Sequence, residues 1–479
     1  MKMLTFMIQE KNNKPIYLQL YEHIKSEIQS GRIEAGSKMP SKRKLSQHLA
    51  VSQNTVQAAY EQLIEEGYIY SLERKGYYVA EIDHIFHLEE KKQELLHKGA
   101  AETEKIIYDF SYQGVDQENF PFSAWRKITK DVINEYDKEL LKQGDPQGHL
   151  YLRQTIAEYI RQSRGVDCKA EQIVISSGTE YLFQILIQIL SQEAVYGIEN
   201  PGHERLNLLF KSNRANYEVL AIDELGMNIS EVRKSRVSVL CVTPSHQFPS
   251  GNIMSINRRA QLLNWANERQ DRYIIEDDYD SEFKYSGKPI PALQGLDKGG
   301  RVIYMGSFSK SLSPALRISY MVLPDELLRI YHKKLSFMIC PVSVMLQKVL
   351  HRFIEEGFFE RHLNKMRNLY KKKREILSEE VSEIRKKLPK DQSLTIKGAD
   401  AGLHLLLEII NGMSEKELVE SAAWHGVKVY PLSKYYLAEK NLPDKPSVLI
   451  GYAAMSKEDI VKAFKLLGYA WFNIKNGEI

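Results

Sequence analysis

Apolar residues recur at helical spacing near the start of the chain. The set within Tyr17–Ile28 returns every three or four residues and predicts a helix that Gly31 ends. A second helix is expected to begin after Ser41, and a third, 53–66, after Ser52, because a serine can cap the helix that follows it. The turn before Ser52 is short. The pattern therefore predicts a compact module of three helices, the last two joined by a tight turn.

Two short aromatic-rich runs, 68–72 and 77–79, follow these helices and predict a β-hairpin with a basic tip. A helix–turn–helix followed by such a wing is typical of a module whose last helix enters the DNA major groove. A small helical interaction domain is the alternative, but the wing, the caps and the basic cluster together favour DNA binding. The predicted DNA contacts are Lys42, Arg43, Ser52, Gln53, Asn54, Thr55, Gln57, Arg74, Lys75 and Gly76.

The residue pattern changes twice beyond the hairpin. Residues 81–106 are rich in Glu, Lys, His and Ala, lack the apolar content of a core, and are expected to form a linker. From about Ile107, short β-rich runs alternate with longer amphipathic segments, which predicts an α/β unit built on a parallel sheet. The expected domains are a DNA-binding domain, 1–80, a linker, 81–106, and an α/β domain, 107–479. The basic stretch 365–388 is interleaved with apolar residues and predicts a solvated helix face.

Composition excludes several classes of protein. The 479 residues are 43% apolar and 27% charged, with 66 basic and 62 acidic residues giving a formal net charge of +4, which is typical of a globular chain. Three scattered cysteines form neither a disulfide framework nor a cysteine-rich metal site, and they fit a reducing cytosol. We see no signal peptide and no apolar run long enough to span a membrane, so we expect a cytoplasmic protein without a metal or a membrane partner.

Candidate chemistry begins with Lys310. It follows an apolar strand, it lies among hydroxyl side chains such as Ser307, and Arg317 is expected one to two helical turns further on. An aldehyde cofactor with a phosphate group needs such a set, because the amine can bond the aldehyde while serine and arginine bind the phosphate. Ser-Lys pairs are common on protein surfaces, so this motif alone is weak.

Two further segments also favour an aldehyde cofactor with a phosphate group. Ser177-Gly178-Thr179 lies between a predicted strand and a predicted helix, where backbone N–H groups and the helix dipole favour an anion. The strand beginning at Tyr273 ends in Glu276-Asp277-Asp278-Tyr279, where a buried carboxylate can pair with a protonated pyridine nitrogen and a tyrosine can hydrogen-bond the ring oxygen. A Mg²⁺ site for phosphoryl transfer is the competing interpretation, but no nucleotide-binding motif accompanies it.

These segments resemble two families. Residues 14–80 resemble the winged helix–turn–helix of the GntR family, and the chain from about 107 to its end resembles the fold type I aminotransferases. Together they resemble the MocR/GabR subfamily of bacterial regulators. The resemblance implies that Lys310 carries pyridoxal 5′-phosphate as a Schiff base. It implies that Asp277 faces the ring nitrogen and Tyr279 the ring hydroxyl. The implied residues around the phosphate are Ser177, Gly178, Thr179, Ser307 and Arg317.

Four positions depart from these families. Gln53 stands where GntR proteins often have arginine, and Phe248 stands where aminotransferases have the asparagine that bonds the cofactor's ring hydroxyl. His203, expected near the cofactor, and Lys434 replace a tyrosine and an effector-binding arginine of the γ-aminobutyrate-responsive members. Lysine keeps the charge but loses the bidentate fork of arginine, so Arg205 is the second candidate for binding the effector. A solvent-facing His203 and a plain surface Lys434 are the alternatives.

The subfamily implies a head-to-tail homodimer that binds double-stranded operator DNA and senses an amino compound, γ-aminobutyrate or a relative, by aldimine exchange at Lys310. Such a protein is not an enzyme, or performs at most half a transamination. A working aminotransferase with an accessory DNA-binding module is the alternative, against which the missing asparagine counts. A third hypothesis is a sensor of pyridoxal phosphate itself.

Overall fold

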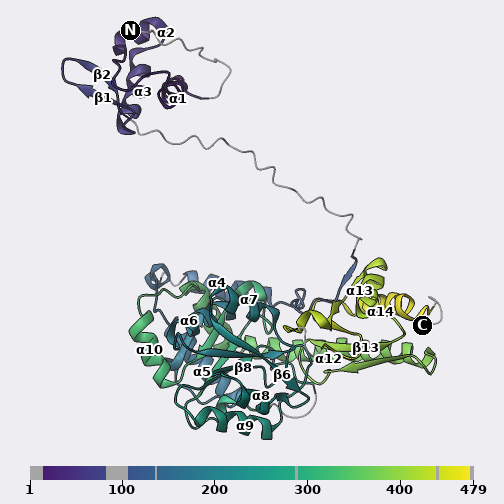
Figure 1. Cartoon of the computed structure of the whole chain (residues 1–479). Coiled ribbons are helices and arrows are strands. Elements are labelled where there is room, and N and C mark those ends of the chain that lie inside the picture. Colours follow the sequence, from purple (N-terminus) through teal and green to yellow (C-terminus); the bar gives the residue numbers. More distant parts are fainter. Residues whose placement is uncertain (1–13, 82–105, 135–136, 286–289, 439–441, 475–479) are drawn as a thin grey trace. The chain divides into compact units, whose positions relative to one another are not determined.

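The computed structural model describes residues 14–81, 106–134, 137–285, 290–438 and 442–474, and the chain divides into two compact units, 1–101 and 102–479 (Figure 1). The segment 81–106 falls almost wholly outside the described residues, so its assignment as a linker, and with it the domain boundaries, stays a prediction.

The N-terminal unit contains the predicted three helices and hairpin. Ser41 Oγ accepts a hydrogen bond from Lys44 N (3.3 Å) and Ser52 Oγ from Thr55 N (3.1 Å), so both predicted caps are confirmed. Between them Ala50 adopts a left-handed conformation (φ 55°) that makes the tight turn. The elements are α1 (Ile16–Gln29), α2 (Lys42–Leu49), α3 (Gln53–Glu65), β1 (Ile69–Leu72) and β2 (Gly76–Val79), around a small apolar core.

The C-terminal unit is built on an eight-stranded sheet of order β4-β11-β10-β9-β8-β5-β6-β7. Its central strands are parallel, whereas β11 and β7 are antiparallel to their neighbours. The strands are β4 (Ile173–Ser176), β5 (Val195–Asn200), β6 (Asn216–Asp223), β7 (Gly226–Met227), β8 (Val239–Val242), β9 (Tyr273–Asp278), β10 (Val302–Ser307) and β11 (Ser319–Val322).

Helices cover both faces of this sheet, as near-continuous apolar strands require (Figure 1). One face carries α6 (Thr179–Ile189), α7 (Glu204–Ser212) and α10 (Asp325–Leu335). The other carries α5 (Leu150–Arg164), α8 (Ile229–Lys234) and α9 (Ile256–Asn267). Successive residues of β4 alternate between the two cores, which is the period-two pattern of a strand.

A second, antiparallel sheet of order β12-β13-β16-β15 follows in the chain, with α13 and α14 packed along it (Figure 1). The long α12 carries the predicted basic stretch, with most of its charges solvated, but Lys373 is buried in an ion pair with Asp116 (2.8 Å). The remaining elements are β3 (Tyr108–Asp109), α4 (Phe122–Asn134), α11 (Val344–Glu355), α12 (Phe358–Lys387), β12 (Ser393–Lys397), β13 (His404–Ile410), α13 (Glu415–Trp424), β14 (Val427–Lys428), β15 (Tyr430–Pro431), β16 (Ser447–Gly451) and α14 (Lys457–Phe472). None of the described helices combines the length and the apolar character needed to cross a membrane.

Candidate functional site

A cavity of ≈ 230 Å³ opens where β9 and β10 end and α6 begins, which is the edge of a parallel sheet where ligands usually bind. The structure brings most of the predicted cofactor and effector residues to this one place. Its lining consists of Tyr112, Gln113, Gly178, Thr179, Glu180, Phe183, His203, Arg205, Leu206, Leu209, Asp277, Tyr279, Ser307, Ser309, Lys310, Pro314, Arg317 and Ser319.

Lys310 lies in the loop after β10 and reaches into the cavity. Its ammonium donates a hydrogen bond to Tyr112 O and lies 5.7 Å from the centre of the Tyr112 ring. Burial lowers the pKa of Lys310 to about 8, with Asp280 opposing and Arg205 adding to that shift. A lysine with such a pKa supplies far more neutral, nucleophilic amine at pH 7 than an exposed lysine does.

The adjacent carboxylates Asp277 and Asp278 have different surroundings because they point to opposite faces of β9. Asp278 is buried in an ion pair with Arg164 (Nε–Oδ2 2.7 Å), and its Oδ2 also accepts hydrogen bonds from Tyr304 and Ser281. Asp277 faces the cavity, and its buried Oδ1 has no hydrogen-bond partner among the described residues. Burial, with the charge of Asp278, raises the pKa of Asp277 to about 7. Asp277 can therefore accept a hydrogen bond from a protonated group of a ligand. Both oxygens of Asp278 are already used in contacts with Arg164.

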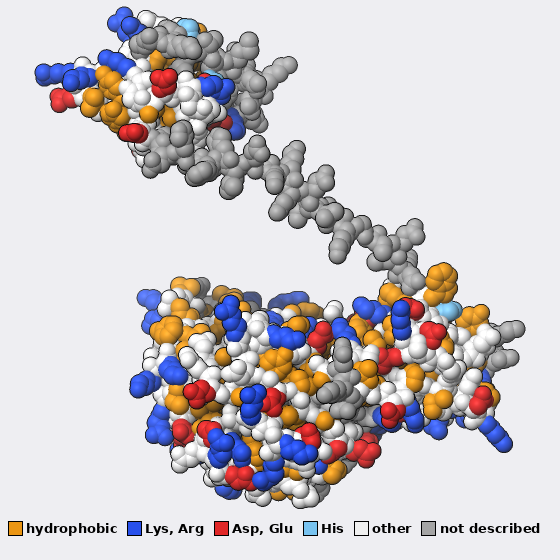
Figure 2. All heavy atoms as spheres, viewed as in Figure 1, with side chains coloured by type: hydrophobic (Ala, Val, Ile, Leu, Met, Phe, Trp, Pro, Cys, Tyr) orange, Lys and Arg blue, Asp and Glu red, His pale blue; other side chains and the backbone are white. Residues whose placement is uncertain are grey.

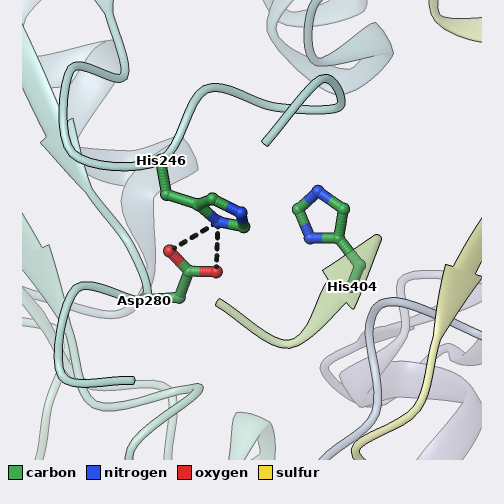
Figure 3. Close-up of side chains that lie close together, drawn as sticks. All are labelled: His246, Asp280 and His404. Atoms are coloured by element: carbon green, nitrogen blue, oxygen red, sulfur yellow. Dashed lines mark hydrogen bonds and ion pairs between the residues drawn. The ribbon is translucent and has the colours of Figure 1, made fainter. Parts of the chain in front are cut away.

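Tyr279 lines the cavity in front of a buried polar cluster. Its hydroxyl donates to His246 O (3.0 Å) and lies 3.2 Å from His246 Nδ1. The same Nδ1 lies 2.9 Å from a carboxylate oxygen of Asp280, and the ring of His404 stands beside that of His246 with centroids 4.7 Å apart (Figure 3). Burial holds the pKa of His404 well below its usual value.

His246, Asp280 and His404 offer donor atoms within 4.8 Å of one another, the spacing of a loose metal site. Asp280 binds Nδ1 of His246, whereas Nε2 of His246 and Nε2 of His404 are buried and have no hydrogen-bond partner among the described residues. Within the cluster, the hydrogen-bonded pair of Asp280 and His246 supports Tyr279, whose hydroxyl donates to His246 O (Figure 3). Sequence reasoning missed this cluster, because its three members come from distant segments.

The predicted anion cradle forms at the N-terminus of α6. Gly178 has φ +107° and a Cβ there would stand 2.1 Å from Arg317 Nη2, so the guanidinium occupies the space that a side chain would fill. Arg317 Nη2 also donates to the backbone carbonyl of Ser177 (3.2 Å). Thr179 and Ser307 line the same cavity, whereas Ser177 is not among its lining residues.

Arg317 does not lie one to two helical turns beyond Lys310, as the spacing predicted. The chain between them is irregular, with a single 3₁₀ turn, Pro314–Leu316, capped by Ser313. Pro314 favours such a turn, and Arg317 follows it in a left-handed conformation (φ 51°). The arginine thus reaches the cradle through a turn.

Glu180 is a cradle residue that sequence reasoning missed, although its place directly after Thr179 was visible. Its Oε2 accepts a hydrogen bond from Arg317 Nη2 (2.9 Å), and its Oε1 lies 3.9 Å from Arg205 Nη1. Burial would raise the pKa of Glu180, but its own backbone N–H, Arg317 and Arg205 together lower it. The cradle therefore holds a carboxylate ion.

His203 lines the cavity. Its ring stacks on that of Phe248 with centroids 3.9 Å apart and planes 4° from parallel, and it meets Tyr279 edge to face at 5.6 Å. Burial, with the charge of Lys310, lowers the pKa of His203 to about 3, so the ring is neutral. Phe248, at the position of the missing asparagine, thus buttresses His203.

The two candidate effector cations are placed differently. Arg205, on α7, lines the cavity and donates through Nη2 to Gln113 Oε1 (3.0 Å). Lys434 is not among the lining residues; its ammonium pairs with Glu204 Oε2 at 3.4 Å, and half of its side chain is exposed. The structure therefore brings Arg205, but not Lys434, to the cavity.

The predicted DNA contacts lie on the surface of the N-terminal unit. Most are exposed, with Lys42, Thr55 and Gly76 half-buried. Lys42 Nζ donates to Gln57 Oε1 (3.3 Å), which ties the start of α2 to the outer face of α3. Arg74 stands at the hairpin tip with φ +58°, and Figure 2 shows basic side chains gathered at that end of the unit. The unit thus presents a polar helix start and a basic wing.

Family models match both units. Residues 16–79 match bacterial regulatory proteins of the gntR family, and residues 111–467 match aminotransferase class I and II. The chain is 44% identical to the uncharacterized HTH-type transcriptional regulator YdeL of Bacillus subtilis, over 95% of this chain and 97% of that protein. It is 32% identical to the probable rhizopine catabolism regulatory protein MocR of Rhizobium meliloti, covering 96% and 95%.

Two further comparisons concern the chemistry of relatives. The HTH-type pyridoxine biosynthesis transcriptional regulator PdxR of Corynebacterium glutamicum is 30% identical, over 87% of this chain and 88% of that protein. Among solved structures, a kynurenine aminotransferase of Pyrococcus horikoshii matches with a TM-score of 0.67 and 25% identity, covering 77% of this chain and 91% of that one. The C-terminal unit therefore has an aminotransferase fold.

Proposed function

The chain belongs to the MocR-type transcriptional regulators of the GntR family, and from this premise we propose that its aminotransferase-like unit binds pyridoxal 5′-phosphate and senses an amino compound. The DNA-binding domain is the winged helix–turn–helix of the N-terminal unit. The amino compound would displace Lys310 from the cofactor, and the altered site would bias the protein between two DNA-binding states, provided that the ligand binds those states with different affinity.

The observation that carries this proposal is the buried oxygen of Asp277, which has no hydrogen-bond partner in the part of the chain that the structure describes. An unsatisfied buried carboxylate is costly, and a protonated pyridine nitrogen is the partner that would satisfy it. It faces the same cavity as Lys310, whose pKa is lowered to about 8, and Gly178, whose missing side chain leaves room for the cradle. The residues present therefore fit the cofactor.

Each side chain has a part in this proposal. When bound, pyridoxal phosphate supplies an aldehyde that reacts with amines and a ring that withdraws electrons. Asp277 would hold a proton on the ring nitrogen, and Tyr279, supported by His246, would bind the ring hydroxyl. The neutral ring of His203 would cover one face of the cofactor. The phosphate would lie among Gly178, Thr179, Ser307 and Arg317, with Ser177 contributing backbone contacts.

The effector is an amino compound, and Arg205 is our candidate for binding an acidic group on it. Lys434 would act there only after leaving Glu204. The geometry favours no single compound, so γ-aminobutyrate stays one candidate among related amino acids.

We also propose a head-to-tail homodimer. Large apolar side chains such as Leu141 (91% exposed) and Phe337 (79% exposed) would be covered by the partner in such a dimer.

We propose further that this unit is a sensor and does not turn over as an aminotransferase. Phe248 offers no hydrogen bond to the cofactor where the enzymes have asparagine, and Lys434 lies away from the cavity. The second candidate, an active aminotransferase, is favoured by the intact set of Lys310, Asp277 and the cradle. A third, a sensor of the cofactor itself, is favoured by the likeness to a pyridoxine biosynthesis regulator.

An absorbance experiment tests the proposal. Purified full-length protein is loaded with pyridoxal phosphate and scanned before and after each member of a panel of amino compounds, with Lys310→Ala as the control. We expect a visible band that the variant lacks and that one compound shifts without continuous keto-acid release. Sustained keto acid with 2-oxoglutarate present would support the enzyme instead. No band in the saturated wild type would refute cofactor binding.

A further inference from the structure

Glu180 occupies the cradle that the proposed function assigns to the cofactor phosphate. Its Oε2 accepts from Arg317 Nη2 at 2.9 Å, and Glu180 itself lies in the first turn of α6. Backbone N–H groups at a helix N-terminus and an arginine are the groups that bind phosphate in proteins. The side chain thus holds ligands that an incoming phosphate needs.

The geometry at Gly178 places the carboxylate inside the cradle. A Cβ built on Gly178 would stand 2.7 Å from Glu180 Oε2 and 2.1 Å from Arg317 Nη2. The carboxylate and the guanidinium therefore lie together over the glycine. Arg205 Nη1 is 3.9 Å from the other oxygen, so two cations of the cavity face this one anion. A phosphate dianion in the same place would meet a negative charge and would have to separate Glu180 from Arg317.

We propose that Glu180 is a tethered competitor for the cofactor phosphate, which lowers the affinity for pyridoxal phosphate and makes occupancy of the site depend on its supply. This inference rests on the proposed function, because it presumes that the cofactor binds here. A low affinity leaves the site partly empty, which is the behaviour expected of the third candidate named above, a sensor of the cofactor itself. It also gives Arg317 a partner whenever the phosphate is absent.

The test compares two ligands that differ only in the phosphate. Full-length protein stripped of cofactor is titrated with pyridoxal 5′-phosphate and with pyridoxal, and binding is followed by absorbance. The variants are Glu180→Gln and Glu180→Ala. The matched control is Glu204→Gln, which removes an acid in the first turn of α7 that pairs with Lys434 at 3.4 Å and is not among the cavity's lining residues.

We expect both Glu180 variants to bind pyridoxal phosphate about tenfold more tightly than wild type, a change of about 1.4 kcal/mol. Their affinity for pyridoxal should stay within about twofold of wild type, and Glu204→Gln should leave both affinities unchanged. Inorganic phosphate should compete with pyridoxal phosphate more strongly in the Glu180 variants, because the cradle is then open.

Three results would overturn the inference. Weaker binding of pyridoxal phosphate by Glu180→Gln would mean that Glu180 holds Arg317 ready for the phosphate. An equal increase in the variants' affinity for pyridoxal would mean that Glu180 affects binding of the ring and not of the phosphate. Unchanged affinities would mean that the carboxylate swings away at no cost. Failure of the proposed function looks different: wild type and variants alike would then take up no pyridoxal phosphate.

Discussion

Asp277 and Asp278 are neighbours in sequence, yet the structure predicts opposite effects when each is changed to asparagine in cofactor-free protein. Arg164 and Asp278 are 6% and 1% exposed, and removing one charge of a buried pair typically costs about 3–5 kcal/mol. Asparagine retains some hydrogen bonds to Tyr304 and Ser281. We therefore expect Asp278→Asn to destabilise the C-terminal unit by about 3 kcal/mol.

Asp277→Asn should stabilise the same protein. A carboxyl whose pKa is 3.8 when unfolded and about 7 when folded costs at most about 4 kcal/mol at pH 7, because one pKa unit corresponds to about 1.4 kcal/mol. Asp277 is only half-buried, so screening by solvent reduces the expected gain to about 1–2 kcal/mol. The wild type loses this stability as pH rises from about 4 to about 7, where the unfolded chain releases a proton that the folded chain keeps. The extra stability of Asp277→Asn over wild type should therefore vanish below about pH 4.

The assay is urea unfolding followed by tryptophan fluorescence, with pyridoxal phosphate removed. All four tryptophans, Trp125, Trp265, Trp424 and Trp471, lie in the C-terminal unit, so their fluorescence reports that unit alone. Comparing the free energies of unfolding at pH 5 and at pH 7 isolates the contribution that the titration of Asp277 makes to stability. If Asp277→Asn destabilises as much as Asp278→Asn, or if its effect is independent of pH, the assignment of the two carboxylates is wrong.

Four further substitutions have expected outcomes. Ser52→Ala removes the cap of α3 and should cost about 1 kcal/mol, seen by calorimetry as a drop of about 4–8 °C in the N-terminal transition; no change would mean that the cap is not needed. Arg74→Ala and Lys75→Ala should each weaken binding to any DNA sequence and reduce the slope of log affinity against log salt by about 1; an unchanged slope would exclude phosphate contact. Gly178→Ala should raise the Kd for pyridoxal phosphate at least about tenfold, because its Cβ meets Arg317 at 2.1 Å; an unchanged titration would refute the cradle.

Local chemistry explains what the sequence could predict. The caps at Ser41 and Ser52 depend on a few adjacent residues, so they were readable directly. The position of Lys310 after a strand also follows from a local pattern, and the resemblance supplied its partners. Arg317 was placed on a helix that does not exist, since residue spacing alone does not distinguish a helix from a turn after proline.

Long-range contacts explain what the sequence could not predict. The His246–Asp280–His404 cluster joins three segments, and the sheet order that brings them together is a property of the whole fold. The split between Asp277 and Asp278 was anticipated from resemblance, but its physical reason is Arg164, 114 residues away in the chain. Lys434 likewise pairs with Glu204, which comes from a distant segment of the chain, so no local pattern could show this contact.

The central claim is that chemistry at Lys310 controls DNA binding, and one measurement tests it most directly. A DNA fragment selected by the full-length protein from a random pool is labelled, and its fluorescence anisotropy is measured with wild type and Lys310→Ala. Each is assayed alone, with pyridoxal phosphate, and with pyridoxal phosphate plus each amino compound. We predict that one compound changes the Kd for DNA in the loaded wild type and has no effect on the variant. A Kd that is the same in every state of the wild type would contradict the account.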